Sequence, residues 1–210
     1  MRPINAMLDQ KLRETLRHVA RFYDQRKVGD IGPLGFRRST DLAKLTACLE
    51  PLIHQGHLIP GGSRFLDMGC GDGRVNLLLS YLVERSIGVE LDELILAEHG
   101  PLRRELEASL RSRALTLPPA NTRLFHGNST EDRIYRRIEK ETGVGPADFD
   151  LFYTYLSMYE EFAQVIADKA KKGSVFMLYG VERILPRLEG LHLLTPQRPI
   201  QGILALYQKR

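Results

Sequence analysis

The sequence contains no tryptophan and only two cysteines among its 210 residues. So few cysteines, with no CxxC pair, exclude a disulfide framework and a cysteine-rich zinc site. Cys48 lies in an apolar helical pattern and Cys70 in a glycine loop, so we expect both to be reduced thiols. The six histidines show no metal-ligand spacing, and we therefore expect no bound metal.

Long apolar runs and internal repeats are also missing. No run reaches the about 18 apolar residues that a membrane-spanning helix needs, and the polar N-terminus differs from a secretory signal. We therefore expect a cytoplasmic protein with no membrane partner. Length and composition predict a single domain, residues 1–210, and leave the oligomeric state open.

Acidic residues are scarce at the N-terminus. The first 40 residues carry nine Lys or Arg and four Asp or Glu, whereas the whole chain has a formal charge of +4. A basic arm of this kind attracts nucleic acid or an acidic protein, and the alternative is a solvated helix face. Neutralising Arg13, Arg17 and Arg21 separates these interpretations.

Two helices form an N-terminal extension, residues 1–58. Apolar residues at helical spacing predict a helix over 5–27, followed by a loop rich in glycine and proline. A second helix extends to about residue 55, and Ser39 or Thr40 is positioned to cap it.

The remainder, residues 62–210, alternates between strands and helices. Such alternation predicts parallel strands with helices on both faces of the sheet, and two final strands without an intervening helix predict an antiparallel hairpin. The predicted strands are 64–68, 87–91, 122–126, 150–155, 174–179, 191–194 and 203–207. The predicted helices are 74–83, 92–113 with a break at Gly100-Pro101, 130–141, 158–172 and a short one near 182–188.

A glycine loop follows the first predicted strand of this core. Gly69, Gly71 and Gly73 alternate with other residues in FLDMGCGDGR, residues 65–74. Glycines permit positive φ and let a ligand approach the backbone, and open α/β sheets bind ligands at the carboxyl ends of their strands. The alternative is that the three are simple turn glycines.

The side chains around this loop separate two classes of cofactor. A dinucleotide loop of the GxGxxG type needs glycine where this chain has Arg74. The carboxylates of Asp67 and Asp72 repel a diphosphate and suit a ligand with a sulfonium and an ammonium group. The phosphate-binding pattern GxxxxGK[ST] is absent.

Polar residues also end the next two strands. Glu90, before Leu91, is placed to accept hydrogen bonds from two ribose hydroxyls. Asn128 is placed to bond an adenine edge, since an amide both donates and accepts. The alternatives are a surface acid at position 90, and a helix cap formed by Asn128 and Ser129.

These segments together resemble the class I S-adenosylmethionine (SAM)-dependent methyltransferases over roughly residues 60–210. The resemblance implies a Rossmann-like α/β fold, with a seven-stranded, mostly parallel sheet whose last strand is antiparallel. It implies SAM as cofactor and S-adenosylhomocysteine (SAH) as product. Position 128 departs from the family, which often has Asp there. The implied cofactor-binding residues are Asp67, Gly69, Cys70, Gly71, Asp72, Gly73, Glu90, Leu91, Asn128, Ser129 and Tyr153.

The methyl acceptor is expected beside the fourth strand of the core. The [DNS]PP[YFW] motif of DNA adenine methyltransferases is absent there. Tyr155 and Glu160 are the candidate catalytic residues, because an aromatic ring attracts a cation and a carboxylate binds or deprotonates an amine. The alternative for each tyrosine is packing within the sheet layers.

Two short segments resemble proteins related to the protein-lysine methyltransferases. They are MGCGDGR, residues 68–74, and YLSMYE, residues 155–160. This likeness implies a nitrogen acceptor, either a protein lysine or a small amine, and a loop before the core that closes on the cofactor, with Phe36, Arg37 and Thr40 as candidates. An RNA or nucleotide methyltransferase and a non-catalytic SAM-binding regulator are the alternatives.

Overall fold

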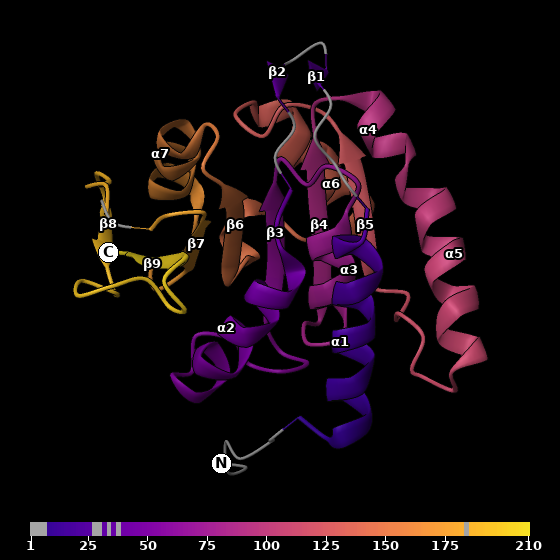
Figure 1. The fold of residues 1–210 in the computed structure, drawn as a ribbon. Coiled ribbons are helices and arrows are strands. Elements are labelled where there is room, and N and C mark those ends of the chain that lie inside the picture. Colours follow the sequence, from indigo (N-terminus) through magenta and orange to yellow (C-terminus); the bar gives the residue numbers. More distant parts are fainter. Residues whose placement is uncertain (1–7, 27–30, 33–34, 37–38, 183–184) are drawn as a thin grey trace.

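Seven strands form one twisted sheet in the order β5-β4-β3-β6-β7-β9-β8 (Figure 1). The computed structural model describes residues 8–26, 31–32, 35–36, 39–182 and 185–210. All neighbouring strands are parallel except that β9 is antiparallel to both β7 and β8. The predicted sheet and its closing hairpin are confirmed. The strands are β3 (Arg64–Met68), β4 (Arg85–Glu90), β5 (Thr122–His126), β6 (Leu151–Tyr155), β7 (Val175–Tyr179), β8 (Leu191–Leu193) and β9 (Leu204–Lys209).

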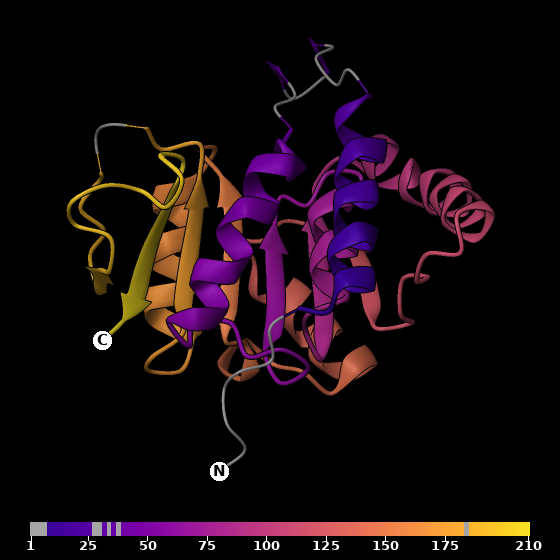
Figure 2. The same ribbon diagram turned by 60° about the horizontal axis from the view of Figure 1, so that its bottom comes forward.

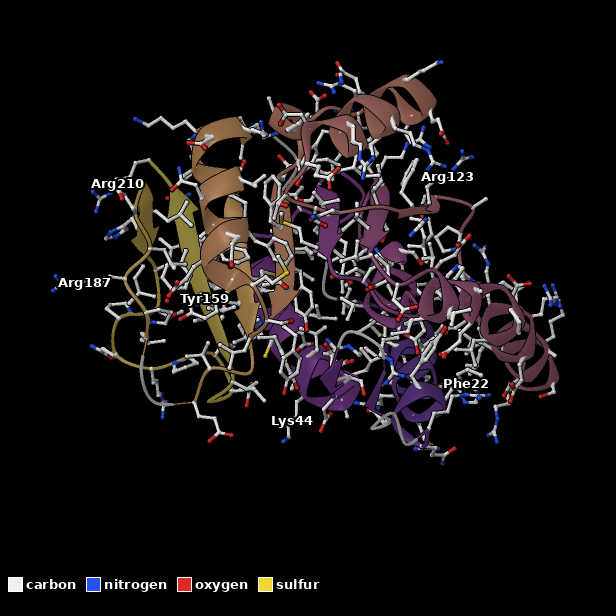
Figure 3. All side chains as sticks on the ribbon, turned by 90° about the horizontal axis from the view of Figure 1, so that it is seen from above. Phe22, Lys44, Arg123, Tyr159, Arg187 and Arg210 are labelled. Atoms are coloured by element: carbon white, nitrogen blue, oxygen red, sulfur yellow. The ribbon has the colours of Figure 1, made fainter. Side chains whose placement is uncertain are left out.

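Helices cover both faces of the sheet (Figures 2 and 3). One hydrophobic core lies under the helices α1, α2, α3 and α5, and a second lies under α6 and α7. Strand β3 contributes Phe65 to the first core and Leu66 to the second, since successive strand residues point to opposite faces. The helices are α1 (Gln10–Asp24), α2 (Leu42–His54), α3 (Arg74–Ser80), α4 (Glu93–Ala97), α5 (His99–Ser112), α6 (Asp132–Thr142), the 3-10 turn η1 (Pro146–Asp148) and α7 (Tyr159–Lys169).

The register of the sheet brings the acidic residues together. Asp67 of β3 pairs with Gly88 of β4 on one side and with Tyr153 of β6 on the other. Glu90 ends β4, opposite His126 of β5. Because parallel strands end at one edge, these residues all lie at the carboxyl edge of the sheet.

The two N-terminal helices are capped by aspartates. Asp9 accepts a hydrogen bond from the Leu12 amide, so α1 starts later than the predicted residue 5. Asp41 accepts one from the Lys44 amide and caps α2. The prediction of Ser39 or Thr40 as the cap is therefore wrong, because the Thr40 hydroxyl bonds to Tyr153 instead.

A small hairpin precedes α2 where the sequence predicted only a loop. Strands β1 (Ile31–Gly32) and β2 (Gly35–Phe36) pair antiparallel and project beyond the carboxyl edge of the sheet (Figure 1). The side chain of Phe36 and all of Arg37, two of the candidates for closing on a cofactor, lie outside the described part of the chain.

Two other predictions of helix need correction. The break in the fourth helical segment falls at Glu98, so Pro101 lies in the first turn of α5, where its missing amide hydrogen costs nothing. Residues 181–182 and 185–188 are not helical, although a short helix was predicted near 182–188. Pro186 disfavours helix at the residue before it, and its carbonyl accepts a hydrogen bond from Tyr207.

Candidate functional site

The glycine loop between β3 and α3 depends on positive φ angles at its three glycines. Gly69, Gly71 and Gly73 have φ of 87°, 56° and 76°. At Gly73 there is a second constraint, because a Cβ there would lie 2.6 Å from the Nδ1 atom of His99 and 2.6 Å from a methyl carbon of Leu124. The loop therefore needs glycine for conformation throughout and, at position 73, for space as well.

Glu90 connects this loop to the next one. One of its carboxylate oxygens accepts a hydrogen bond from the Gly71 amide at 2.7 Å, and the other accepts one from the Asp92 amide at 2.9 Å. The residue is half-buried, and a carboxylate has about four acceptor positions. Glu90 is therefore oriented by the backbone and keeps capacity for two further donors.

Asp67 is a buried carboxylate with an unpartnered oxygen. It is 1% exposed, and its Oδ1 has no hydrogen-bond partner in the described part of the structure. Burial raises the pKa of the Asp67 carboxyl well above its usual range, and the charges of Glu90 and Asp72 raise it further. An unpartnered buried polar group is costly, so this oxygen marks a place where a hydrogen-bond donor or cation is missing.

Asp67 faces a small cavity of about 40 Å³ at the carboxyl edge. The cavity is lined from three sides: by the glycine loop, by residues just before α2, and by two tyrosines of β6. Thr40 and Tyr153 close one side, with their hydroxyl oxygens 2.5 Å apart. The lining residues are Ser39, Thr40, Asp67, Gly69, Cys70, Gly71, Asp72, Arg74, Val75, Tyr153 and Tyr155.

The second acid of the loop, Asp72, is engaged by a neighbouring arginine. Its carboxylate receives the Arg74 guanidinium at 2.7 Å, and both side chains are buried. The guanidinium carbon of Arg74 also lies 5.4 Å from the ring centre of Tyr23 in α1. The sequence suggested that Asp72 offers its charge to a cationic ligand, whereas in the structure that charge is compensated by Arg74 and the pair ties α1 to the loop.

Asn128 is used within its own turn. Its side-chain oxygen accepts hydrogen bonds from the amide and the hydroxyl of Thr130 at 2.9 and 2.8 Å. Ser129 is buried, and its carbonyl accepts a bond from Tyr135. Leu91 is 47% exposed beside Glu90, as single apolar residues on a protein surface often are.

The residues predicted to meet the acceptor divide into two groups. The ring of Tyr155 lines the cavity and packs 5.5 Å from the ring of Tyr179. Glu160 is exposed in the first turn of α7, where its carboxylate accepts a bond from the Tyr159 hydroxyl, and it lies outside the cavity lining. Between them Met158 has φ 53°, a strained conformation for a residue with a side chain.

Sequence reasoning missed two residues beside the site. His99 bonds the Asp72 carbonyl at 3.0 Å, and burial lowers the pKa of its imidazole. Its position directly before the predicted break at Gly100-Pro101 is the signal that pointed to it. Tyr179 packs against both Tyr153 and Tyr155 and donates to the Asp41 carbonyl. Tyr179 ends a strand, as Tyr155 does, and this position in the sequence could have indicated that it lies near the site.

No group of three or more His, Cys, Asp or Glu among the described residues is placed to hold a metal ion. None of the helices described is both long and apolar enough to cross a membrane. Cys48 and Cys70 are free, as predicted, and both are buried.

Comparison with known proteins gives structural neighbours but no sequence match. No model of a protein family matches the chain, and no curated protein matches it. The solved structures that resemble it include three at 12 to 16% identity. YhhF from Escherichia coli, a candidate methyltransferase, has 16% identity and a TM-score of 0.51, with 88% of this chain and 90% of that chain covered.

Two further neighbours extend the likeness. An RNA methyltransferase from Salinibacter ruber, solved with S-adenosyl-L-homocysteine, has 12% identity and a TM-score of 0.51, covering 82% of this chain and 93% of that one. A variant of the protein MtNAS has 12% identity and a TM-score of 0.54, covering 95% and 70%. At such low identity the likeness concerns architecture, and this chain has the Rossmann-like, seven-stranded fold found among SAM-dependent methyltransferases.

Proposed function

We propose that the protein is a SAM-dependent methyltransferase that transfers a methyl group to nitrogen. The observation that carries this proposal is the buried, unpartnered carboxylate oxygen of Asp67 at the carboxyl edge of the sheet. A ligand that supplies a cation and hydrogen-bond donors there satisfies this oxygen, and SAM carries both an ammonium and a sulfonium group. A dinucleotide brings a diphosphate, which this carboxylate repels.

The other residues around the site fit the same cofactor. Glu90 is oriented by two backbone amides and retains acceptor capacity for the ribose hydroxyls. Leu91 follows β4, and Asn128 and Ser129 follow β5, so we assign these residues to the adenine of the cofactor. Gly69, Cys70, Gly71 and Gly73 allow close approach to the backbone.

Cofactor entry requires the cavity to enlarge. Its volume of about 40 Å³ is little more than the about 30 Å³ that one water occupies in the liquid. Ligand sites span roughly 300–1,000 Å³. Because the glycine loop is held by Glu90 and Arg74, we assign the enlargement to the other side of the cavity, where the Thr40 hydroxyl contacts Tyr153.

The acceptor approaches from β6 and α7 in this proposal. The ring of Tyr155 attracts a protonated amine or the sulfonium through its π face, and Glu160 binds the amine or removes its proton. Methyl transfer is an in-line displacement, so the protein mainly aligns the two reactants and excludes water. A protein lysine or a small amine fits this arrangement.

Calorimetric titration with SAM, SAH and NAD tests the cofactor. Binding of the first two with no binding of NAD supports the proposal, and binding of NAD alone contradicts it. Methyl transfer from labelled SAM to protein or small amines then tests the acceptor. Tyr155→Phe keeps the π face and is the control for Tyr155→Ala, and Glu160→Gln keeps the size while removing the charge. Unchanged turnover in Tyr155→Ala and Glu160→Gln excludes these residues.

RNA is the second candidate acceptor. The basic N-terminal segment favours it, and one neighbour of the same fold is an RNA methyltransferase. Transfer of labelled methyl groups to RNA and not to protein or amines favours this candidate. SAM binding without transfer to any of these acceptors favours a non-catalytic regulator.

A further inference from the structure

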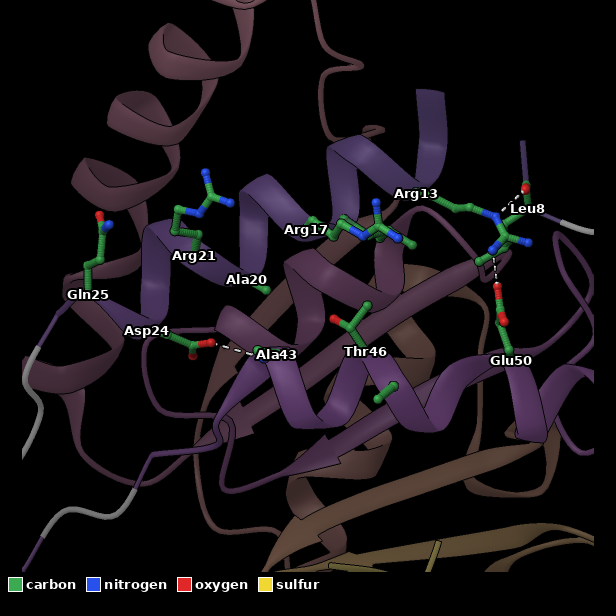
Figure 4. A pocket seen from close by; sticks show the side chains of 12 residues that line it. Leu8, Arg13, Arg17, Ala20, Arg21, Asp24, Gln25, Ala43, Thr46 and Glu50 are labelled. Atoms are coloured by element: carbon green, nitrogen blue, oxygen red, sulfur yellow. Dashed lines mark hydrogen bonds and ion pairs between the residues drawn. The ribbon is translucent and has the colours of Figure 1, made fainter. Parts of the chain in front are cut away.

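A groove runs between α1 and α2 on the outer side of the first core (Figure 4). It encloses about 650 Å³, much more than the cavity beside Asp67. Its floor is made of small and aliphatic side chains, and arginines stand along the α1 side. The lining residues are Leu8, Arg13, Leu16, Arg17, Ala20, Arg21, Asp24, Gln25, Ala43, Thr46, Ala47 and Glu50.

Both ends of the groove are fixed by acidic residues. At one end Glu50 of α2 pairs with Arg13 of α1 at 2.7 Å. At the other end the Asp24 carboxylate accepts hydrogen bonds from the Leu42 and Ala43 amides at 2.8 and 2.9 Å. These contacts hold the two helices in place, so the groove is a preformed feature of the helix pair.

Two arginines along the groove remain available. Arg17 and Arg21 are exposed, and the side chain of neither has an ion-pair or hydrogen-bond partner among the described residues. They stand four residues apart on α1, so their attachment points are about 6 Å apart along the helix axis. Two acidic side chains at positions i and i+4 of another helix are separated by the same distance and lie on one face of that helix, so they match the two arginines.

The lining favours a protein segment over a nucleic acid strand. None of the lining residues is aromatic, so the groove offers no platform on which bases stack. A phosphate backbone that followed the groove would also meet the carboxylates of Glu50 and Asp24. By contrast, Ala20, Ala43 and Ala47 leave room for the apolar side chains of a third helix, the arrangement of helix-in-groove recognition.

We propose that the α1–α2 groove binds an acidic amphipathic helix of a partner protein. The apolar face of that helix lies on the alanine floor, and two carboxylates one turn apart pair with Arg17 and Arg21. The Asp24 end of the groove leads to Leu42, two residues from Thr40 at the cofactor cavity. The next step rests on the proposed function. If the protein methylates lysine, the protein docked in the groove is the substrate whose lysine is methylated.

Selection of displayed peptides tests the groove without knowledge of the natural partner. A library of helical peptides of about 16 residues, long enough to be helical when bound, is selected on the full-length protein. We expect the enriched peptides to carry Asp or Glu at i and i+4 beside an apolar face. We expect Arg17→Glu with Arg21→Glu to weaken the binding of these peptides by about tenfold or more, through loss of two ion pairs and like-charge repulsion.

A matched pair on another helix controls for net charge. Arg136 and Lys140 are also exposed and four residues apart, but they lie on α6, which covers the opposite face of the sheet. Arg136→Glu with Lys140→Glu should leave peptide binding within about twofold, because exposed charges beyond a Debye length of about 10 Å are largely screened. An equal loss in both double variants overturns the proposal.

Three other results also overturn it. Enriched peptides without the acidic pair, or enriched peptides that bind the Arg17→Glu and Arg21→Glu variant unchanged, place the binding elsewhere. Single-stranded RNA of about 16 nucleotides that displaces the peptides and depends on the same two arginines assigns the groove to nucleic acid. Peptide binding is measured without cofactor, so failure here and failure of SAM binding are separate results.

Discussion

The cavity beside Asp67 and the groove between α1 and α2 differ in charge, burial and connection to the rest of the protein. The cavity is small, and its key carboxylate, that of Asp67, is 1% exposed. The groove is much larger and has three arginines and two acidic residues in its lining, and Arg17 and Arg21 are exposed. Both regions share α1, because Tyr23 near the end of this helix lies against the Arg74 guanidinium of the glycine loop.

Burial determines how strongly an unpartnered charge affects folding stability in each region. An exposed arginine costs the fold almost nothing, since water solvates it, whereas an unpartnered carboxylate in the interior opposes folding. Asp67 is therefore a residue that the folded protein tolerates at a cost in stability, and its replacement should change stability and ligand binding in opposite directions. The arginines of the groove should affect binding alone.

The largest effect is expected from Asp67→Asn. Because burial raises the pKa of Asp67, this acid costs the folded protein stability at neutral pH, so the cofactor-free variant should melt at a higher temperature. SAM affinity should fall by about 3 kcal/mol through loss of a charge-assisted contact. Thermal unfolding and calorimetry measure the two effects. Asp150→Asn is the control, because the Asp150 carboxylate is bonded to the Arg64 amide and the Lys171 ammonium. That variant should be less stable than the wild type, and a loss of stability in Asp67→Asn as well would contradict the comparison.

Glu90→Ala is expected to have the next largest effect. It removes the acceptor for the ribose hydroxyls and for the Gly71 and Asp92 amides, so SAM affinity should fall by about 1.5–3 kcal/mol. Glu90→Gln keeps one oxygen acceptor and should lose less. Equal affinity in the wild type and Glu90→Ala would remove Glu90 from the cofactor site.

The glycine loop provides a comparison within the cavity itself. Gly73→Ala introduces a Cβ within 2.6 Å of His99 and Leu124 at a positive φ, and we expect a loss of stability of about 2–3 kcal/mol. Gly69→Ala has the same type of φ but no atom within 4 Å of the new Cβ, so its loss should be about 1 kcal/mol. Denaturant unfolding measures both, and a larger loss at position 69 would contradict the steric argument.

Tyr23→Phe should have the smallest effect. The Tyr23 hydroxyl is buried and, among the described residues, has no hydrogen-bond partner, and burial raises the pKa of this group. Its removal keeps the ring beneath Arg74 and should raise stability by about 1 kcal/mol. SAM affinity should not change, which distinguishes this unpartnered group from Asp67. A marked loss of affinity would mean that Tyr23 contributes to the cofactor site.

The parts of the protein that the sequence predicted well are those encoded over a few residues. The alternation of strands and helices, the glycine loop and the acid at position 90 are local patterns, and the strand order follows from them by the rules of parallel sheets. The antiparallel closing strand was predicted for the same reason. The small hairpin β1–β2 was missed because strands of two residues carry no periodicity.

The parts that were not predicted depend on contacts between distant residues. Thr40 and Tyr153 are 113 positions apart, and their contact takes Thr40 away from the capping role that its local sequence suggested. Arg74 was noted only as the residue that excludes a dinucleotide loop, and its pairing with Asp72 and stacking on Tyr23 depend on where α1 packs. Local sequence contains no record of such packing.

The most direct test of the account is the pH dependence of SAM affinity in the wild type and in Asp67→Asn. The pKa of Asp67 in the free protein is raised, and a cationic ligand binds the ionised form better. Wild-type affinity should therefore increase as the pH rises towards that pKa and level off above it, while Asp67→Asn should bind weakly and lack this component. The same affinity and the same pH profile in both proteins would contradict the claim that Asp67 holds the cofactor.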